Sequence, residues 1–240
     1  SLSENAMPRL PRRALLLPLF LLIPALPIWA LPAHAARNDH QVWGVVQGTV
    51  DLGGRATSAF DVQYRVTDGA SRQGQVLIRP AIGVYLDKTT AAYIGYAFVT
   101  TDPLGGTPTD EHRVFEQLAF RIAGDGKGPT LTGRTRLEQR FVEGWTGHTG
   151  WRLRQQVRGT LPLGDRGVAL VSTLEPFVSF NTTGWGQRAG FDQVRAFAGV
   201  SLPVARGIAI EPGYMGQYIA RYRQPDRMNH VISLSLSLRR

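Results

Sequence analysis

Charged and polar side chains recur at every second position in two stretches between residues 130 and 158. The first run is Arg134, Arg136, Glu138 and Arg140, and the second is Arg152, Arg154, Gln156 and Arg158. Because successive side chains of an extended strand point to opposite faces, each run places its charges on one face of a strand. The pattern therefore predicts two strands, each with a basic face and an opposite face of apolar residues, namely Leu137, Phe141, Trp151, Leu153 and Val157.

The same alternation continues through most of the chain, and no stretch shows a sustained helical period. Turn-forming sequences such as Gly124-Asp125-Gly126-Lys127-Gly128 separate the alternating segments. We predict eleven extended segments, at about 41–51, 58–67, 75–86, 91–101, 110–123, 129–143, 149–161, 168–181, 188–202, 207–223 and 228–238.

The N-terminus carries features of a secretory signal. Met7 opens a basic stretch with Arg9, Arg12 and Arg13, an apolar stretch follows, and Ala33-His34-Ala35 has the form of a cleavage site. We expect cleavage after Ala35 and a single domain over residues 36–240 in the bacterial outer membrane. The absence of cysteine excludes disulfides, thiolate catalysis and thiol-ligated zinc.

An exported chain with many strands of this kind indicates an antiparallel up-and-down β-barrel in a membrane. Its apolar faces would point outward to lipid, and its basic faces would line the lumen. Single-chain bacterial barrels have even strand numbers, so we predict twelve strands. Ten is the alternative, in which the segment around Trp43 lies outside the wall. A soluble lipocalin-like barrel, with its apolar faces inward, is a second alternative for the fold.

Aromatic residues near the strand ends are typical of interfacial girdles in membrane barrels. We assign to the girdles Trp43, Tyr64, Tyr96, Trp145, Trp151, Trp185, Tyr218 and Tyr222.

The polar faces predict a set of residues that line the lumen. These are Arg113, Arg121, Arg134, Arg136, Glu138, Arg140, Arg152, Arg154, Arg158, Glu175, Arg195 and Glu211. Three interpretations stay open: ion pairs that fill the lumen, a narrow channel for small anions, or basic residues at one rim that bind lipopolysaccharide phosphates. The formal net charge of +9 does not indicate nucleic acid, because the charges alternate along strands and form no patch with exposed aromatics.

Signals for catalysis are weak. An outer-membrane lipid hydrolase would need a nucleophile and a base on one side of the wall. The candidates are His148 with Thr149 and His230 with Ser233, and the Gly-x-Ser-x-Gly motif is absent. No cluster of residues predicts a metal site, and no cofactor is expected.

Several ordered sequence blocks carry a resemblance to a known family. They include Glu111-His112-Arg113-Val114-Phe115-Glu116-Gln117, Arg134–Phe141, Trp151-Arg152-Leu153-Arg154, Glu175-Pro176-Phe177, Gly190–Arg195 and Asn229-His230. Over residues 41–238 the chain resembles an uncharacterised bacterial family known as domain of unknown function 2490. The resemblance implies an outer-membrane β-barrel. One departure is the end of the chain, Leu238-Arg239-Arg240, where many such barrels have an aromatic residue.

Overall fold

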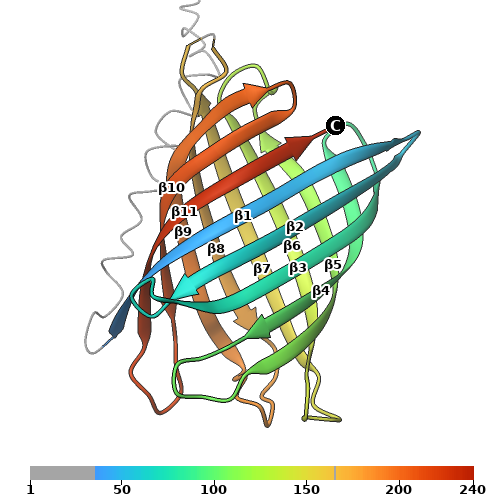
Figure 1. The fold of residues 1–240 in the computed structure, drawn as a ribbon. Helices are drawn as coiled ribbons and strands as arrows, with labels where there is room; N and C mark the ends of the chain where they lie inside the picture. The colour runs from blue at the N-terminus through green and yellow to red at the C-terminus, as the bar shows by residue number, and fades with distance from the viewer. Residues whose placement is uncertain (1–35, 165) are drawn as a thin grey trace, which may run out of the picture.

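The computed structural model describes residues 36–164 and 166–240, which form eleven β-strands and their connections (Figure 1). The predicted signal segment, residues 1–35, lies outside the described residues. In chain order the strands are β1 (Arg37–Gly53), β2 (Ala56–Thr67), β3 (Arg72–Tyr85), β4 (Thr90–Thr101), β5 (Thr109–Ala123), β6 (Thr130–Val142), β7 (Gly150–Pro162), β8 (Ala169–Ser179), β9 (Gly190–Ala205), β10 (Ile208–Ile219) and β11 (Arg227–Arg239).

The strands form one closed barrel in which each strand pairs with its neighbours in the sequence. All of these sequential pairs are antiparallel, and the barrel closes through a parallel pair between β1 and β11. The register of that pair runs from Arg37 opposite Arg227 to Thr49 opposite Arg239. In Figure 1 both strands accordingly run upward from the lower end.

The eleven strands correct the prediction of twelve and its alternative of ten. The even number was predicted from the rule that single-chain bacterial barrels have even strand numbers. An odd number makes the first and last strands run in the same direction, so that only a parallel pair can close the sheet. The segment around Trp43 is part of β1 and belongs to the wall.

The two faces of the wall differ as the alternation predicts. Large apolar side chains lie exposed on the outside, among them Ile82 at 65% and Ile232 at 60%. Charged and polar side chains fill the inside together with a few aromatic ones. The assignment of Trp43 to an interfacial girdle is wrong. Its side chain lies inside the barrel and is only 3% exposed, whereas a girdle residue would face outward.

The connections differ in length between the two ends of the barrel. The short-turn end holds residues 54–55, 86–89, 124–129, 163–168 and 206–207, and β11 ends there. At the turn 54–55, Gly54 and the adjacent Gly53 have φ angles of 61° and 92°, which glycine adopts without strain. The long-loop end holds residues 68–71, 102–108, 143–149, 180–189 and 220–226, and β1 begins there.

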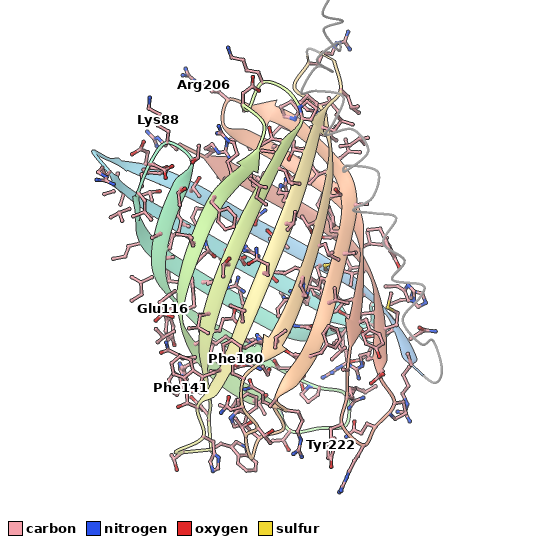
Figure 2. All side chains as sticks on the ribbon, turned by 180° about the vertical axis from the view of Figure 1, so that it is seen from behind. Lys88, Glu116, Phe141, Phe180, Arg206 and Tyr222 are labelled. Atoms are coloured by element: carbon pink, nitrogen blue, oxygen red, sulfur yellow. The ribbon has the colours of Figure 1, made fainter. Side chains whose placement is uncertain are left out.

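Figure 2 shows how side chains differ between these ends. Lys88 and Arg206 lie at the short-turn end, and Phe141, Phe180 and Tyr222 lie toward the long-loop end. In the part of the chain that the structure describes, no helix has the length and apolar character needed to cross a membrane.

Candidate functional site

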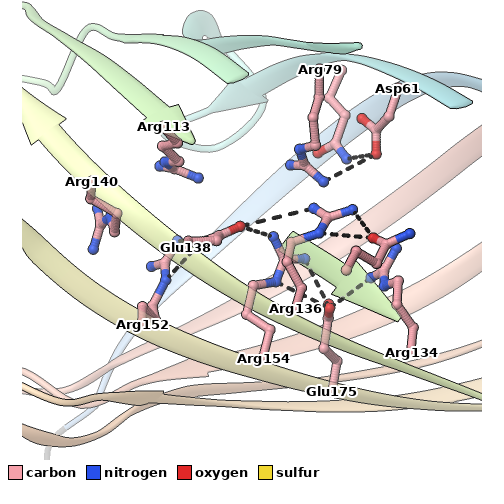
Figure 3. A network of polar contacts seen from close by, with 12 residues as sticks. Asp61, Arg79, Arg113, Arg134, Arg136, Glu138, Arg140, Arg152, Arg154 and Glu175 are labelled. Atoms are coloured by element: carbon pink, nitrogen blue, oxygen red, sulfur yellow. Dashed lines mark hydrogen bonds and ion pairs between the residues drawn. The ribbon is translucent and has the colours of Figure 1, made fainter. Parts of the chain in front are cut away.

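Six charged residues inside the barrel form what we call the Arg–Glu core. They come from the neighbouring strands β6, β7 and β8, whose alternation directs the charges inward. The residues are Arg134, Arg136, Glu138, Arg152, Arg154 and Glu175 (Figure 3).

Each carboxylate of the Arg–Glu core is shared between arginines. Glu138 accepts hydrogen bonds from Arg152 Nη2 at 2.6 Å and from Arg154 Nη1 at 2.8 Å. Glu175 accepts from Arg154 Nη2 at 2.8 Å and from Arg134 Nη2 at 2.7 Å. Arg154 therefore bridges the two carboxylates, and its guanidinium links them into one network.

Further ion pairs extend the network across the lumen. Arg158 on β7 reaches Glu211 on β10 at 2.7 Å, and Arg152 on β7 reaches Asp192 on β9 at 3.0 Å. In both pairs the two strands are not neighbours in the sheet. These contacts therefore connect separate parts of the wall through the interior.

Two more carboxylates hold arginines near the Arg–Glu core. Glu111 pairs with Arg113 at 2.7 Å and with Arg140 at 2.5 Å. Asp61 on β2 pairs with Arg79 on β3 at 3.4 Å.

Aromatic rings occupy the space between the arginines. The guanidinium carbon of Arg136 lies 4.4 Å from the ring centre of Phe115, and that of Arg154 lies 4.5 Å from the ring centre of Phe177. Arg65 lies 3.7 Å from the ring centre of Trp43. Such stacking stabilises a cation over the negative face of a ring.

The side chains at the centre of the Arg–Glu core are buried. Glu138 is 1% exposed, and Arg136, Arg154 and Glu175 are each 4% exposed, so water has almost no access to them. Toward the short-turn end the interior is more open, because the side chains of Arg134 and Arg158 are 22% and 29% exposed. Solvent therefore reaches Arg134 and Arg158 more easily than the buried residues around Glu138.

Positive charge in this interior is not fully paired. Arg65 and Arg195 lie against Trp43, and none of the ion pairs in the described part of the chain involves them. Buried donor atoms without a hydrogen-bond partner in that part include Arg79 Nε, Arg134 Nε and Arg136 Nη1. A buried donor without a hydrogen-bond partner costs free energy.

Comparison with known proteins places the chain in a family. The model of a family described as "Protein of unknown function (DUF2490)" matches residues 40–229. The chain belongs to this family. An uncharacterised protein of Methylorubrum extorquens is 34% identical over 226 residues, which cover 91% of this chain and 97% of the relative. The part of the DUF2490 chain that the family model matches runs from β1 into β11 and so contains the Arg–Glu core.

The structure brings most of the predicted lumen residues together. All but Arg121 lie in the interior as part of the Arg–Glu core or of its surroundings: Arg113, Arg134, Arg136, Glu138, Arg140, Arg152, Arg154, Arg158, Glu175, Arg195 and Glu211. Arg121 stands apart, because it is exposed at the end of β5, near the short-turn end.

Sequence reasoning missed several members of the network. Asp61, Arg65, Arg79, Glu111 and Asp192 were not among the predicted lumen residues, although the first three lie on the polar faces of alternating strands. That alternation is the signal that could have found them.

The two histidine candidates for an enzyme site lie in different surroundings. His230 faces outward, where its Nδ1 lies 2.7 Å from the Tyr214 hydroxyl, whereas Ser233 faces inward and is 6% exposed. The structure therefore does not bring this candidate pair together, because an odd spacing places the two side chains on opposite sides of the wall. His148 lies exposed in the connection 143–149, with its ring at 86° to that of Trp145.

A second histidine contact lies on the outer face near the long-loop end. His112 Nδ1 lies 2.5 Å from the Tyr96 hydroxyl, and its Nε2 lies 3.2 Å from Glu143. Within residues 36–164 and 166–240, no group of three or more His, Cys, Asp or Glu residues is placed to hold a metal ion.

Proposed function

We propose that this chain is an outer-membrane β-barrel protein whose lumen is closed by the Arg–Glu core, and that it acts as a non-conducting barrel in contact with outer-membrane lipid. The observation that carries this proposal is the packing of Glu138 and Arg154 in the lumen, at 1% and 4% exposure. An open pore would leave such side chains in water.

The outer wall supports a membrane location. Large apolar side chains lie exposed on several strands of the wall, for example Ile82 on β3, Ile94 on β4, and Ile232 and Leu234 on β11. A soluble protein rarely exposes an apolar band of this kind. A lipocalin-like barrel would also place its apolar faces inside, and the charged interior argues against that arrangement.

Fractionation tests the membrane location. We expect the protein in the outer-membrane fraction, with a heat-dependent shift in migration on a detergent gel, because a closed barrel resists detergent until it is heated. Recovery in the soluble periplasmic fraction without detergent would contradict the proposal and favour the lipocalin-like alternative.

An anion-selective channel is the second candidate function. The observation in its favour is the excess of arginine in the lumen, since a positive lining attracts anions. Passage would require the side chains of the Arg–Glu core to move aside.

Planar-bilayer recording separates the two functions. For a closed barrel we expect no steady conductance from folded protein whose heat-dependent gel shift has been verified. A steady conductance with anion preference, weakened in Arg134→Gln plus Arg158→Gln, would replace the non-conducting barrel with the channel.

A further inference from the structure

Glu116 on β5 is a charged side chain in the apolar band of the outer wall. Strand register places it in one lateral row with Ser58, Ile82, Ile94, Leu137 and Leu153. Figure 2 shows it on the wall between the two ends of the barrel. An ionisable side chain at membrane depth is costly and therefore points to a function.

The depth of Glu116 follows from its own strand. His112 lies on the same face of β5 and is near the long-loop end, with Tyr96 and Glu143 as partners. With a rise of about 3.3 Å per residue and a strand tilt of about 40°, Glu116 lies roughly 10 Å further toward the middle of the wall.

One polar side chain contacts the carboxylate of Glu116, and it does not use all of the hydrogen-bond acceptor sites of the two oxygens. Gln139 Nε2 on β6 lies 3.1 and 3.4 Å from the two carboxylate oxygens. No other hydrogen bond to these oxygens and no ion pair of Glu116 is found in the part of the chain that the structure describes. An ionised carboxylate has about four lone-pair sites, so further donors can bind.

An apolar groove lies beside Glu116 on the outer wall. It has a volume of about 860 Å³ and crosses the strands from β1 to β6. The next lateral row contains two alanines, whose small side chains leave the space that forms the groove. Its residues are Ala56, Val84, Ala92, Leu118 and Thr135. The groove therefore combines an apolar floor with a single carboxylate at its side.

We propose that this groove binds the acyl chain of an outer-membrane lipid that carries a hydroxyl group, and that the hydroxyl donates a hydrogen bond to Glu116. The proposal rests on the membrane location proposed above. The apolar lining selects a hydrocarbon chain, and the carboxylate selects a donor. A hydroxyl is a neutral donor, so it can enter the apolar band at a lower cost than an ammonium group.

A second copy of this chain fits the same surface less well. A two-fold contact centred on this row would bring the two Glu116 carboxylates close together, and like charges at close range repel. A lipid hydroxyl avoids this repulsion.

Lipid retention tests the proposal. The full-length protein, purified in detergent with its heat-dependent gel shift verified, is incubated with two phospholipids that differ only in a hydroxyl on the acyl chain. Native mass spectrometry then measures the lipid retained. We expect a preference of roughly tenfold for the hydroxylated lipid, since a hydrogen bond to a charged acceptor is among the stronger ones.

Three variants define the outcome. Glu116→Leu should abolish the preference, and Glu116→Gln should keep part of it, because its amide oxygen still accepts. His230→Leu removes a polar side chain from the outer face of β11 and should leave the preference unchanged.

Two results would overturn the proposal. One is equal retention of both lipids by the folded wild-type protein. The other is a dimer that dissociates in Glu116→Leu, which would assign the surface to a second copy. Both are distinct from a failed membrane location, which appears in fractionation.

Discussion

Arg136 and Arg154 are register partners on β6 and β7, so two like charges lie directly opposite each other on a buried face. Such a pair destabilises a sheet unless a counter-charge lies between them. Glu138 supplies that charge, because its Oε1 lies 2.8 Å from Arg154 Nη1 and 3.9 Å from Arg136 Nη1. The stability of the barrel interior therefore depends on Glu138.

Glu138→Gln should strongly destabilise the barrel. The substitution removes a buried negative charge that holds Arg152 and Arg154. Breaking a buried ion pair from one side costs about 3–5 kcal/mol, because the remaining charge stays uncompensated. Urea-induced unfolding in lipid vesicles, followed by tryptophan fluorescence, measures the change in the free energy of unfolding.

Glu143→Gln is the matched control for this experiment. Its side chain is 61% exposed in the connection 143–149, where solvent screens its contact with His112. We expect a change within about 0.5 kcal/mol. Equal small effects at positions 138 and 143 would show that water reaches the core, which would contradict a closed lumen.

Leu153→Arg tests the outward orientation of β7. Leu153 lies in the apolar lateral row that also contains Leu137. An arginine on the lipid face near the middle of a membrane should lower the free energy of unfolding by about 2–4 kcal/mol. Leu163→Arg, in the short connection 163–168, should cost about 0–1 kcal/mol because the penalty falls toward the interface. The same cost at both positions would contradict a lipid-facing wall.

The strands could be predicted from sequence because their signal is local. Alternation located all eleven segments and the inward faces of β6 and β7, where Arg136, Glu138, Arg152 and Arg154 lie. The even strand number failed because barrel closure pairs the two ends of the chain. That contact is long-range, and no local pattern encodes it.

The pairings within the Arg–Glu core were likewise beyond sequence reasoning. Arg158 meets Glu211 across the lumen, and that contact depends on the diameter and tilt of the closed barrel. Trp43 was misplaced for a related reason. Its position near a strand end indicated an interface, but its parity on β1 directs the ring inward against Arg65.

Parallel closure predicts a specific cross-link. Val42 on β1 and Ile232 on β11 are register partners, and both are exposed on the outer face. The chain has no cysteine, so the designed disulfide is the only one that Val42→Cys plus Ile232→Cys can form within one molecule. After oxidation and heating, we expect faster migration on a non-reducing gel, because the bond closes a large loop in the unfolded chain.

The control for the cross-link is Val42→Cys plus Ile94→Cys, whose second position lies on β4, away from β1 in the sheet. It should form no intramolecular bond. If the first pair also stayed reduced in folded protein, β1 and β11 would not be neighbours and an additional strand would have to close the barrel.

The unequal connections predict how the barrel is oriented. Membrane barrels of bacteria have short periplasmic turns and longer extracellular loops. The short-turn end, where β11 finishes, should therefore face the periplasm, and the connection 143–149 should face the outside.

Cysteine labelling tests this orientation. Thr146→Cys lies in the connection 143–149 and Lys127→Cys lies in the short connection 124–129, and both positions are exposed. In intact cells a membrane-impermeant maleimide should label position 146 and leave position 127 unlabelled, and both should react once the outer membrane is permeabilised. The reverse pattern would place the short turns outside, and it would move the more open part of the lumen, near Arg134 and Arg158, from the periplasmic to the extracellular side.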